Sequence, residues 1–252
     1  MTQTDNLLPE IIAIARDAGK IIMNYYKTGI DVVKKSDASP VTEADKAADL
    51  YIVDKIKNLT PDYAIVSEEG NKPNVRNFDY FWLIDPLDGT KSFIRGSGYF
   101  TVNIALIDAA RKPILGVIYE PISESMYYGS PNGAFLEQNG ITKKIKVSNY
   151  IIASSALVSH SHLDHTTQEY LEKYNIEQKL SHASSIKLCF LAEGKADIYP
   201  RFGRTMEWDI AAGHAILNAA GGTILTPEDA QFVYGKETFQ NGNFIAYGKK
   251  IL

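Results

Sequence analysis

Hydrophobic residues recur every three or four positions over residues 7–26, with polar residues between them, and this period predicts an amphipathic helix. A polar loop over residues 34–40 precedes a second helical pattern, which runs to Ile56. Thr42 is placed to cap the start of that helix, with Asp45 in its first turn. The chain is therefore expected to open with two helices.

The middle of the chain changes to short apolar runs separated by turn residues, which is typical of β-strands. The expected strands cover residues 64–66, 80–84, 101–107 and 114–119. Asn139-Gly140 is a further hairpin signal, because these residue types tolerate the backbone of a tight turn. This region predicts a largely antiparallel sheet.

Beyond residue 148 helical and strand-like patterns alternate. Helices are expected over residues 166–174, 186–193 and 209–220, and strands near 196–199 and 244–247. No flexible linker marks the change. We divide the chain into an N-terminal α+β domain, residues 1–148, which carries most candidate metal ligands, and a C-terminal α/β domain, residues 149–252.

Composition narrows the class of protein. The 252 residues are 45% hydrophobic and 22% charged, as in an ordinary soluble globular protein. The net charge is -4, and the basic residues form no block, so a nucleic-acid surface is not expected. A small anion needs only a local basic pocket.

Cys189 is the only cysteine, so no intrachain disulfide can form and a reducing compartment is expected. The N-terminus has no basic leader, and no apolar run approaches the roughly 20 residues that span a bilayer. We expect a cytoplasmic protein without an integral membrane segment. Peripheral attachment to the cytoplasmic face of the inner membrane stays open.

Acidic residues gather in four segments at expected strand ends and helix starts, where open α/β sheets place their sites. The segments are Asp45, the Glu68-Glu69 pair, Asp85-Pro86-Leu87-Asp88-Gly89-Thr90 and Glu207-Trp208-Asp209. Magnesium prefers oxygen ligands, and a pair of magnesium ions needs several carboxylates. The pattern predicts such a site.

The segment over residues 85–90 is the most specific of the four. Pro86 biases the residue before it away from helical geometry, so a tight turn after the strand can aim Asp85 and Asp88 into one pocket. The Leu87 carbonyl is a further candidate ligand. Gly89 leaves room where a phosphate would approach, and its amide and the next one could donate to the phosphate if a helix starts there.

Each of the other segments has an ordinary structural alternative. Asp45 could merely answer Thr42 and the helix dipole, and Asp209 could be a simple helix cap. The Glu68-Glu69 pair could be a solvated turn. These alternatives stay open at this point.

The haloacid-dehalogenase phosphatases carry a similar motif, Asp-x-Asp-Gly-Thr, in which the first aspartate is a covalent nucleophile. In this chain the position two before Asp88 is Pro86. Since that nucleophile is missing, water is expected to attack.

Two longer motifs carry a family resemblance. They are Trp82-Leu83-Ile84-Asp85-Pro86-Leu87-Asp88-Gly89-Thr90 and Trp208-Asp209-Ile210-Ala211-Ala212-Gly213-His214. With Ser184-Ser185-Ile186-Lys187 and Tyr199-Pro200-Arg201-Phe202-Gly203, the chain resembles the inositol monophosphatase superfamily, and within it the bacterial 3'(2'),5'-bisphosphate nucleotidases. The resemblance implies the layered α/β/α/β/α sandwich of the inositol monophosphatase and fructose-1,6-bisphosphatase type.

The resemblance also implies a metal centre with two or three Mg²⁺ ions, inhibited by Li⁺. The implied ligands are Glu68, Asp85, the Leu87 carbonyl, Asp88 and Asp209. Asp45 would lie near a third metal or the attacking water. Thr90, with Asp45 or Glu68, would orient and activate that water.

The substrate that the resemblance implies is adenosine 3',5'-bisphosphate, which would lose its 3'-phosphate. The implied substrate-binding residues are Asp88, Gly89, Thr90, Asp209, Ser184, Lys187, Arg201 and His162. Lys187 and Arg201 would grip the second phosphate, and Ser184 and His162 are the weaker candidates. Rival hypotheses are inositol monophosphatase or fructose-1,6-bisphosphatase activity at the same site, and a non-catalytic binding or regulatory protein on this fold.

Other polar residues receive a plainer interpretation. The histidines at 160, 162 and 165, with Asp164, are compatible with a transition-metal site, but a solvated loop is the simpler hypothesis. Cys189 and His214 are expected to pack in the core. Thr205, Met206 and Glu207 are assigned no role.

Overall fold

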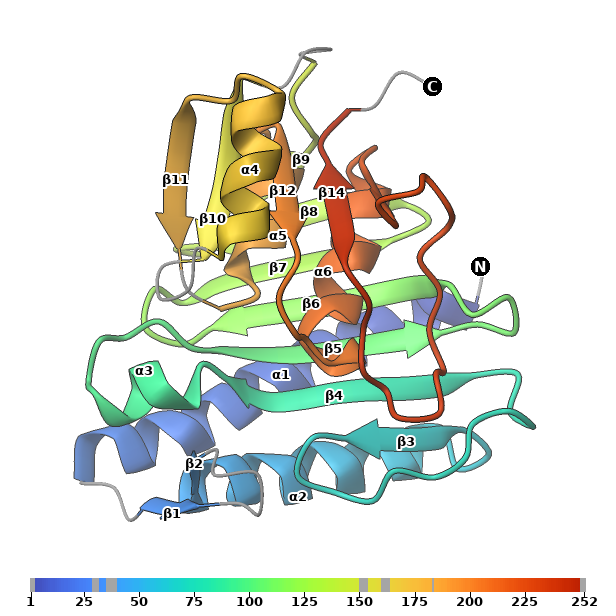
Figure 1. The fold of residues 1–252 in the computed structure, drawn as a ribbon. Helices are drawn as coiled ribbons and strands as arrows, with labels where there is room; N and C mark the ends of the chain where they lie inside the picture. The colour runs from blue at the N-terminus through green and yellow to red at the C-terminus, as the bar shows by residue number, and fades with distance from the viewer. Residues whose placement is uncertain are drawn as a thin grey trace.

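The computed structural model describes residues 3–28, 32–34, 40–149, 154–159, 164–182 and 184–249, and it has five layers (Figure 1). Two helices cover one face of a seven-stranded sheet, and two more lie between this sheet and a five-stranded one. A last helix packs on the outer face of the second sheet. The expected α/β/α/β/α sandwich is confirmed.

The first layer consists of α1, Gln3–Thr28, and α2, Glu43–Leu59. Their apolar faces bury Ile11 and Ile52 in one cluster with Trp82 of the sheet. Helix α1 begins four residues before the predicted start, because its first residues are polar and add nothing to the hydrophobic period. Both predicted helices are present.

The seven-stranded sheet has the order β3-β4-β5-β6-β7-β8-β9. Its strands are β3 Ala64–Ser67, β4 Phe81–Asp88, β5 Thr101–Ile107, β6 Pro113–Glu120, β7 Ser125–Ser130, β8 Gly133–Gln138 and β9 Ile141–Ile145. Only β3 and β4 pair in parallel, so the prediction of a largely antiparallel sheet is confirmed. Asn139 and Gly140 join β8 to β9 with φ of 53° and 74°, as the hairpin signal indicated.

The five-stranded sheet has the order β11-β10-β12-β14-β13. Its strands are β10 Ser155–Ser159, β11 Gln178–His182, β12 Ile198–Arg201, β13 Thr223–Leu225 and β14 Phe244–Tyr247. The helices of this half are α4 His165–Lys173, α5 Ile186–Ala192 and α6 Glu207–Ala219, close to their predicted ranges. A two-stranded ribbon, β1 Val32–Lys34 and β2 Pro40–Thr42, precedes α2. Within the described residues, none of the helices is both long and apolar enough to cross a bilayer.

Helix α6 lies directly on the backbone of the large sheet. A Cβ atom at Gly129 of β7 would lie 2.7 Å from Ile216 Cα, and one at Gly116 of β6 would overlap the Ala212 carbonyl oxygen. One apolar core therefore runs from β4 through α6 into the second sheet. The division into domains 1–148 and 149–252 stays a prediction.

Candidate metal centre and substrate pocket

Strand β4 carries Asp85 and Asp88 beside β5. The strand continues through Asp88, beyond its predicted end at residue 84, because the chain pairs with β5 again at Thr101 after a break in register. Within the break the Leu87 N–H donates to Asp85 Oδ1 at 3.1 Å. The expected tight turn is thus an irregularity inside the strand.

Gly89 ends this segment and starts the short helix α3, Thr90–Ile94. Its φ is 94°, and a Cβ atom there would lie 2.5 Å from the Tyr99 carbonyl oxygen. Since only glycine fits this close approach without strain, the sequence fixes the backbone next to Asp88. A helix does begin at Thr90, as the sequence suggested. The contact of these amides with a phosphate stays a prediction.

Three carboxylates from separate parts of the chain meet at the end of the large sheet. Glu68 follows β3, Asp85 lies on β4, and Asp209 lies in the first turn of α6. One oxygen of each lies within 4.8 Å of the others. Because β3 and β4 are parallel, their carboxyl ends bring the first two together, and the close packing of α6 brings the third. Three such oxygens suit a hard divalent cation.

The charges of this acidic centre repel one another. Burial raises the pKa of Asp85 well above its usual value, and Glu68 and Asp88 raise it further. Desolvation and the charge of Asp88 raise the pKa of Asp209 to about 8, although the Met206 N–H opposes the shift. A divalent cation would offset this repulsion, so the donor set and its charge both fit a magnesium-type ion.

Asp88 faces the segment before α5. Its Oδ2 accepts hydrogen bonds from Ser184 Oγ at 2.6 Å and from Ser185 N at 2.5 Å. It is not one of the three carboxylates that lie within 4.8 Å of one another. Asp88 therefore links the metal centre to the C-terminal half, and its role as a ligand stays a prediction.

Asp45 serves two partners at once. Its Oδ2 accepts the N–H of Thr42 at 2.8 Å and completes a capping box at the start of α2, so Asp45 does cap the helix. Its Oδ1 accepts the hydroxyl of Thr90 at 3.1 Å, and the same hydroxyl lies 3.3 Å from the Leu87 carbonyl. Burial raises the pKa of Asp45 against the hydrogen bonds from both threonines. The helix cap thus also positions a hydroxyl beside the acidic centre.

A cavity of about 180 Å³ opens beside Asp88 and Asp209. Three cationic side chains line it, Lys187, Arg201 and Arg204. The cavity therefore has an acidic side and a basic side.

Lys187 is only 6% exposed. Its Nζ donates to the Ser184 carbonyl at 2.6 Å and lies 5.4 Å from the centre of the Tyr199 ring. Burial lowers the pKa of Lys187 to about 8, and the negative charge of Asp88 opposes the shift. The ammonium group is thus poorly solvated, and an anion in the cavity would stabilise it.

Arg201 has a buried Nε with no hydrogen-bond partner among the described residues. Its Nη2 donates to the Arg204 carbonyl at 3.4 Å, and a Cβ atom at Gly203 would lie 3.3 Å from its Cζ. An unpaired buried donor is costly unless a ligand completes it. The guanidinium therefore fits an anionic group in the cavity.

A family model described as the inositol monophosphatase family matches residues 3–250. The chain belongs to the inositol monophosphatase family. The relative in Escherichia coli K12, named 3'(2'),5'-bisphosphate nucleotidase CysQ, is 44% identical over 94% of this chain and 98% of its own length. Its namesake in Haemophilus influenzae is 32% identical over 98% of this chain and 95% of its own length.

Solved structures of this family share the fold. The crystal structure of CysQ from Bacteroides thetaiotaomicron superposes with a TM-score of 0.85 at 36% identity, and 99% of both chains is covered. The Thermotoga maritima inositol monophosphatase superposes with a TM-score of 0.78 at 27% identity, covering 96% of this chain and 92% of that one. Both contain the layers seen here.

Of the histidine cluster, the structure describes only His165 and the neighbouring Asp164, so the role of His162 in substrate binding stays a prediction. His160 and His162 lie outside the described residues. Asp164 caps α4 through Thr167, and His165 lies exposed beside Glu169. These contacts favour a solvated surface over a metal site.

Sequence reasoning missed some polar residues around the site. Arg204 lines the cavity but was not singled out, although it directly follows the segment 199–203 that carries the resemblance. Glu207 was assigned no role, yet it is fully buried and hydrogen-bonded two residues before Asp209. No local pattern reveals either contact.

Proposed function

We propose that this chain is a metal-dependent 3'(2'),5'-bisphosphate nucleotidase that converts adenosine 3',5'-bisphosphate to AMP and inorganic phosphate. The observation that carries the proposal is a single cavity that joins the acidic centre to three cations. A substrate with one phosphate to be cleaved and another to be held matches this pairing of opposite charges. The names of the CysQ relatives support the same assignment.

The acidic residues would hold the metal. Glu68, Asp85 and Asp209, together with Asp88 and the Leu87 carbonyl, would bind two or three Mg²⁺ ions. When bound, these ions supply an acidified water and stabilise negative charge on the leaving oxygen. Li⁺ is expected to inhibit by competing for this centre.

Thr90 and Asp45 would handle the proton of the attacking water. Thr90 donates to Asp45 Oδ1, which leaves its oxygen lone pairs facing away from the carboxylate. The water proton would pass to Thr90 as the threonine proton passes to Asp45, whose raised pKa suits an acceptor. Glu68 is the alternative acceptor.

The basic side of the cavity would hold the 5'-phosphate. Lys187 and Arg201 supply an ammonium group and a guanidinium fork, and Arg204 adds a third positive charge. Ser184 would contribute a hydroxyl. The 3'-phosphate would then lie against the segment 88–90, next to the acidic centre.

Phosphate release from three substrates tests the proposal: adenosine 3',5'-bisphosphate, inositol 1-phosphate and fructose 1,6-bisphosphate, each with Mg²⁺ and with or without Li⁺. We expect preference for the bisphosphate nucleotide, with the 5'-phosphate retained in the product by ³¹P NMR. Preference for inositol 1-phosphate or fructose 1,6-bisphosphate would assign the site to the rival reaction. No turnover of any of them would favour a binding or regulatory protein.

A further inference from the structure

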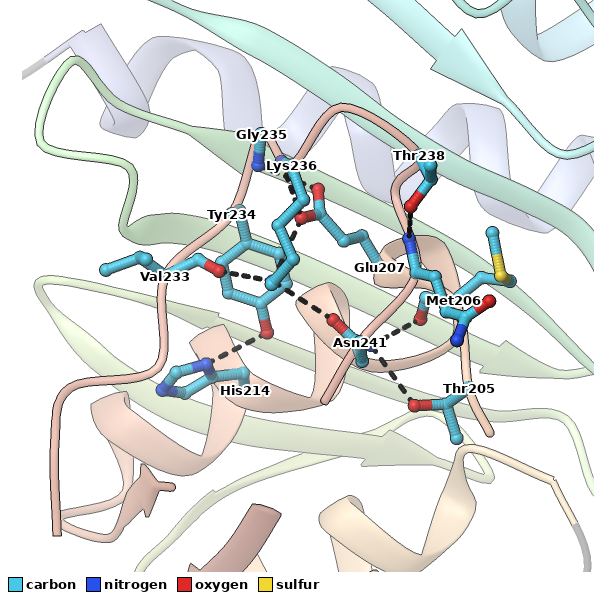
Figure 2. Close-up of polar contacts among 11 residues, drawn as sticks. Thr205, Met206, Glu207, His214, Val233, Tyr234, Gly235, Lys236, Thr238 and Asn241 are labelled. Carbon is cyan, nitrogen blue, oxygen red and sulfur yellow. Dashed lines mark hydrogen bonds and ion pairs between the residues drawn. The ribbon is translucent and has the colours of Figure 1, made fainter. Parts of the chain in front are cut away.

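The segment over residues 233–241 is fastened to the first turn of α6. The backbone N–H of Glu207 donates to the Phe239 carbonyl at 2.8 Å, and the N–H of Asn241 donates to the Thr205 carbonyl at 2.9 Å. Figure 2 shows the side chains that complete this contact. The turn that carries Asp209 is thus held from outside the helix.

Glu207 is the centre of the contact, and it is 0% exposed. Its Oε2 accepts the N–H of Gly235 at 2.8 Å. Its Oε1 accepts both the N–H and the Nζ of Lys236, each at 3.0 Å (Figure 2). Both oxygens are occupied by donors of the chain, so Glu207 is not a spare metal ligand.

Asn241 extends the network toward the acidic centre. Its Oδ1 lies 3.3 Å from Lys236 Nζ, and its Nδ2 donates to the Met206 carbonyl at 2.7 Å and to Thr205 Oγ1 at 3.2 Å (Figure 2). The N–H of Met206 in turn donates to Asp209 Oδ2 at 2.8 Å. The network therefore reaches the Asp209 carboxylate through the backbone of Met206, whose carbonyl accepts from Asn241 and whose N–H donates to Asp209.

A buried ion pair adds little net stability compared with packed apolar residues, so stability alone does not account for this network. A network whose groups are all satisfied does fix one geometry. Metal affinity depends strongly on that geometry, because outer groups orient the ligands. Resting on the metal centre of the proposed function, we propose that Glu207, Lys236 and Asn241 are positioning residues, which set the place of the Asp209 carboxylate and thereby the affinity for the divalent ion.

The affinity for Mn²⁺ tests this directly, because the electron paramagnetic resonance signal of free Mn²⁺ counts the unbound ion without any substrate. We compare the variants Asn241→Leu and Glu207→Gln with the unmodified protein, all shown to be folded by circular dichroism. Each is expected to bind Mn²⁺ about 10-fold or more weakly, within the range that outer-group substitutions cause. Lys236→Met is expected to weaken binding similarly, and Lys236→Arg, which keeps the charge, to restore most of it.

Tyr234→Phe is the matched control. The Tyr234 hydroxyl joins the same segment to the middle of α6 through a buried hydrogen bond to His214 Nδ1 at 2.9 Å (Figure 2). Its loss is expected to lower the urea midpoint of unfolding but to leave Mn²⁺ affinity within twofold. If Glu207, Lys236 and Asn241 had only a structural role, every variant would change the urea midpoint and none would change the affinity for Mn²⁺.

Two further results separate this inference from the proposed function. If Asp209→Asn weakens Mn²⁺ binding while Asn241→Leu and Glu207→Gln leave it within twofold, the positioning role is wrong and the metal centre stands. If neither Asp209→Asn nor Asp85→Asn changes Mn²⁺ binding, the metal centre itself is wrong, and the positioning role falls with it.

Discussion

Glu207 and Asp209 lie on the same turn of α6, but their hydrogen-bonding and electrostatic environments differ. Glu207 is fully buried, and the N–H of Gly235 and both the N–H and Nζ of Lys236 satisfy it. Asp209, two residues later, has one N–H donor and lies among other carboxylates, and desolvation together with the charge of Asp88 raises its pKa to about 8. Donors from the chain thus satisfy Glu207, whereas the surroundings of Asp209 are short of positive charge. An acid of raised pKa among other carboxylates therefore points to a ligand from outside the chain.

The largest expected effect comes from removing a charge of the acidic centre. Asp85→Asn should lower kcat by about 10³-fold or more, because a carboxylate that is proposed to bind the metal loses its charge. Without metal, the free energy of unfolding should stay the same or rise, since repulsion falls. Steady-state kinetics and urea unfolding in EDTA check both parts. The exposed Asp62→Asn is the control, and near-normal turnover of Asp85→Asn would contradict the assignment.

Removing the counter-charge of Glu207 should lower stability in addition to weakening metal binding. Lys236→Met leaves Glu207 buried without its counter-charge, which should cost about 3 kcal/mol of unfolding free energy. Lys46→Met breaks the exposed pair with Glu43 and should cost under about 0.5 kcal/mol. Urea unfolding in EDTA measures both. Equal losses would mean that burial does not distinguish the two pairs.

Removing a positive charge from the basic side of the cavity should slow the hydrolysis only of nucleotides that carry a 5'-phosphate. Arg201→Met should lower kcat/KM for adenosine 3',5'-bisphosphate by about 10- to 100-fold, the value of one charged hydrogen bond. For 3'-AMP, which lacks the 5'-phosphate, the loss should stay within threefold. The control Lys173→Met removes an exposed charge on α4. Equal losses on both nucleotides would show that Arg201 does not recognise the second phosphate.

The acidic centre should also make stability depend on pH. The Asp209 carboxyl ionises near pH 8 in the folded chain and at its usual value of 3.8 when unfolded, so raising the pH between these values favours unfolding. Without metal, the advantage of Asp209→Asn over the unmodified protein should grow across this window, by up to about 1.4 kcal/mol per pH unit. Urea unfolding at several pH values in EDTA tests this. With saturating Mg²⁺, Asp209→Asn should be less stable than the unmodified protein. In EDTA, a difference in stability that does not change with pH would contradict the raised pKa.

The parts predictable from the sequence are those with a local cause. The cap of α2 by Thr42 and Asp45 and the hairpin at Asn139-Gly140 follow from residues within a few positions of one another. The tight turn expected at Asp85-Pro86 is instead a break in register within β4, which depends on pairing with β5. Helical periods located α1, α2 and α6 to within a few residues. The first residues of α1 are polar, so they add nothing to the hydrophobic period, and the predicted helix began too late.

The unpredicted parts depend on long-range contacts. Strands β10 and β11 pair in parallel and were not predicted, because short strands of that kind lack a clear polar alternation. Glu207 meets Lys236 only after the chain returns from α6, and Arg204 lines the cavity only because β12 ends beside it. Such pairings have no fixed spacing in sequence.

The glycines beneath α6 have a consequence for how substrate is received. With no side-chain layer between helix and strands at Gly116 and Gly129, the helix has little freedom to slide over the sheet. Glu68 and Asp85 on one side and Asp209 on the other are therefore assembled once, during folding. We therefore expect ions and nucleotide to enter a site whose parts are already in place, without a large movement of one half of the molecule against the other.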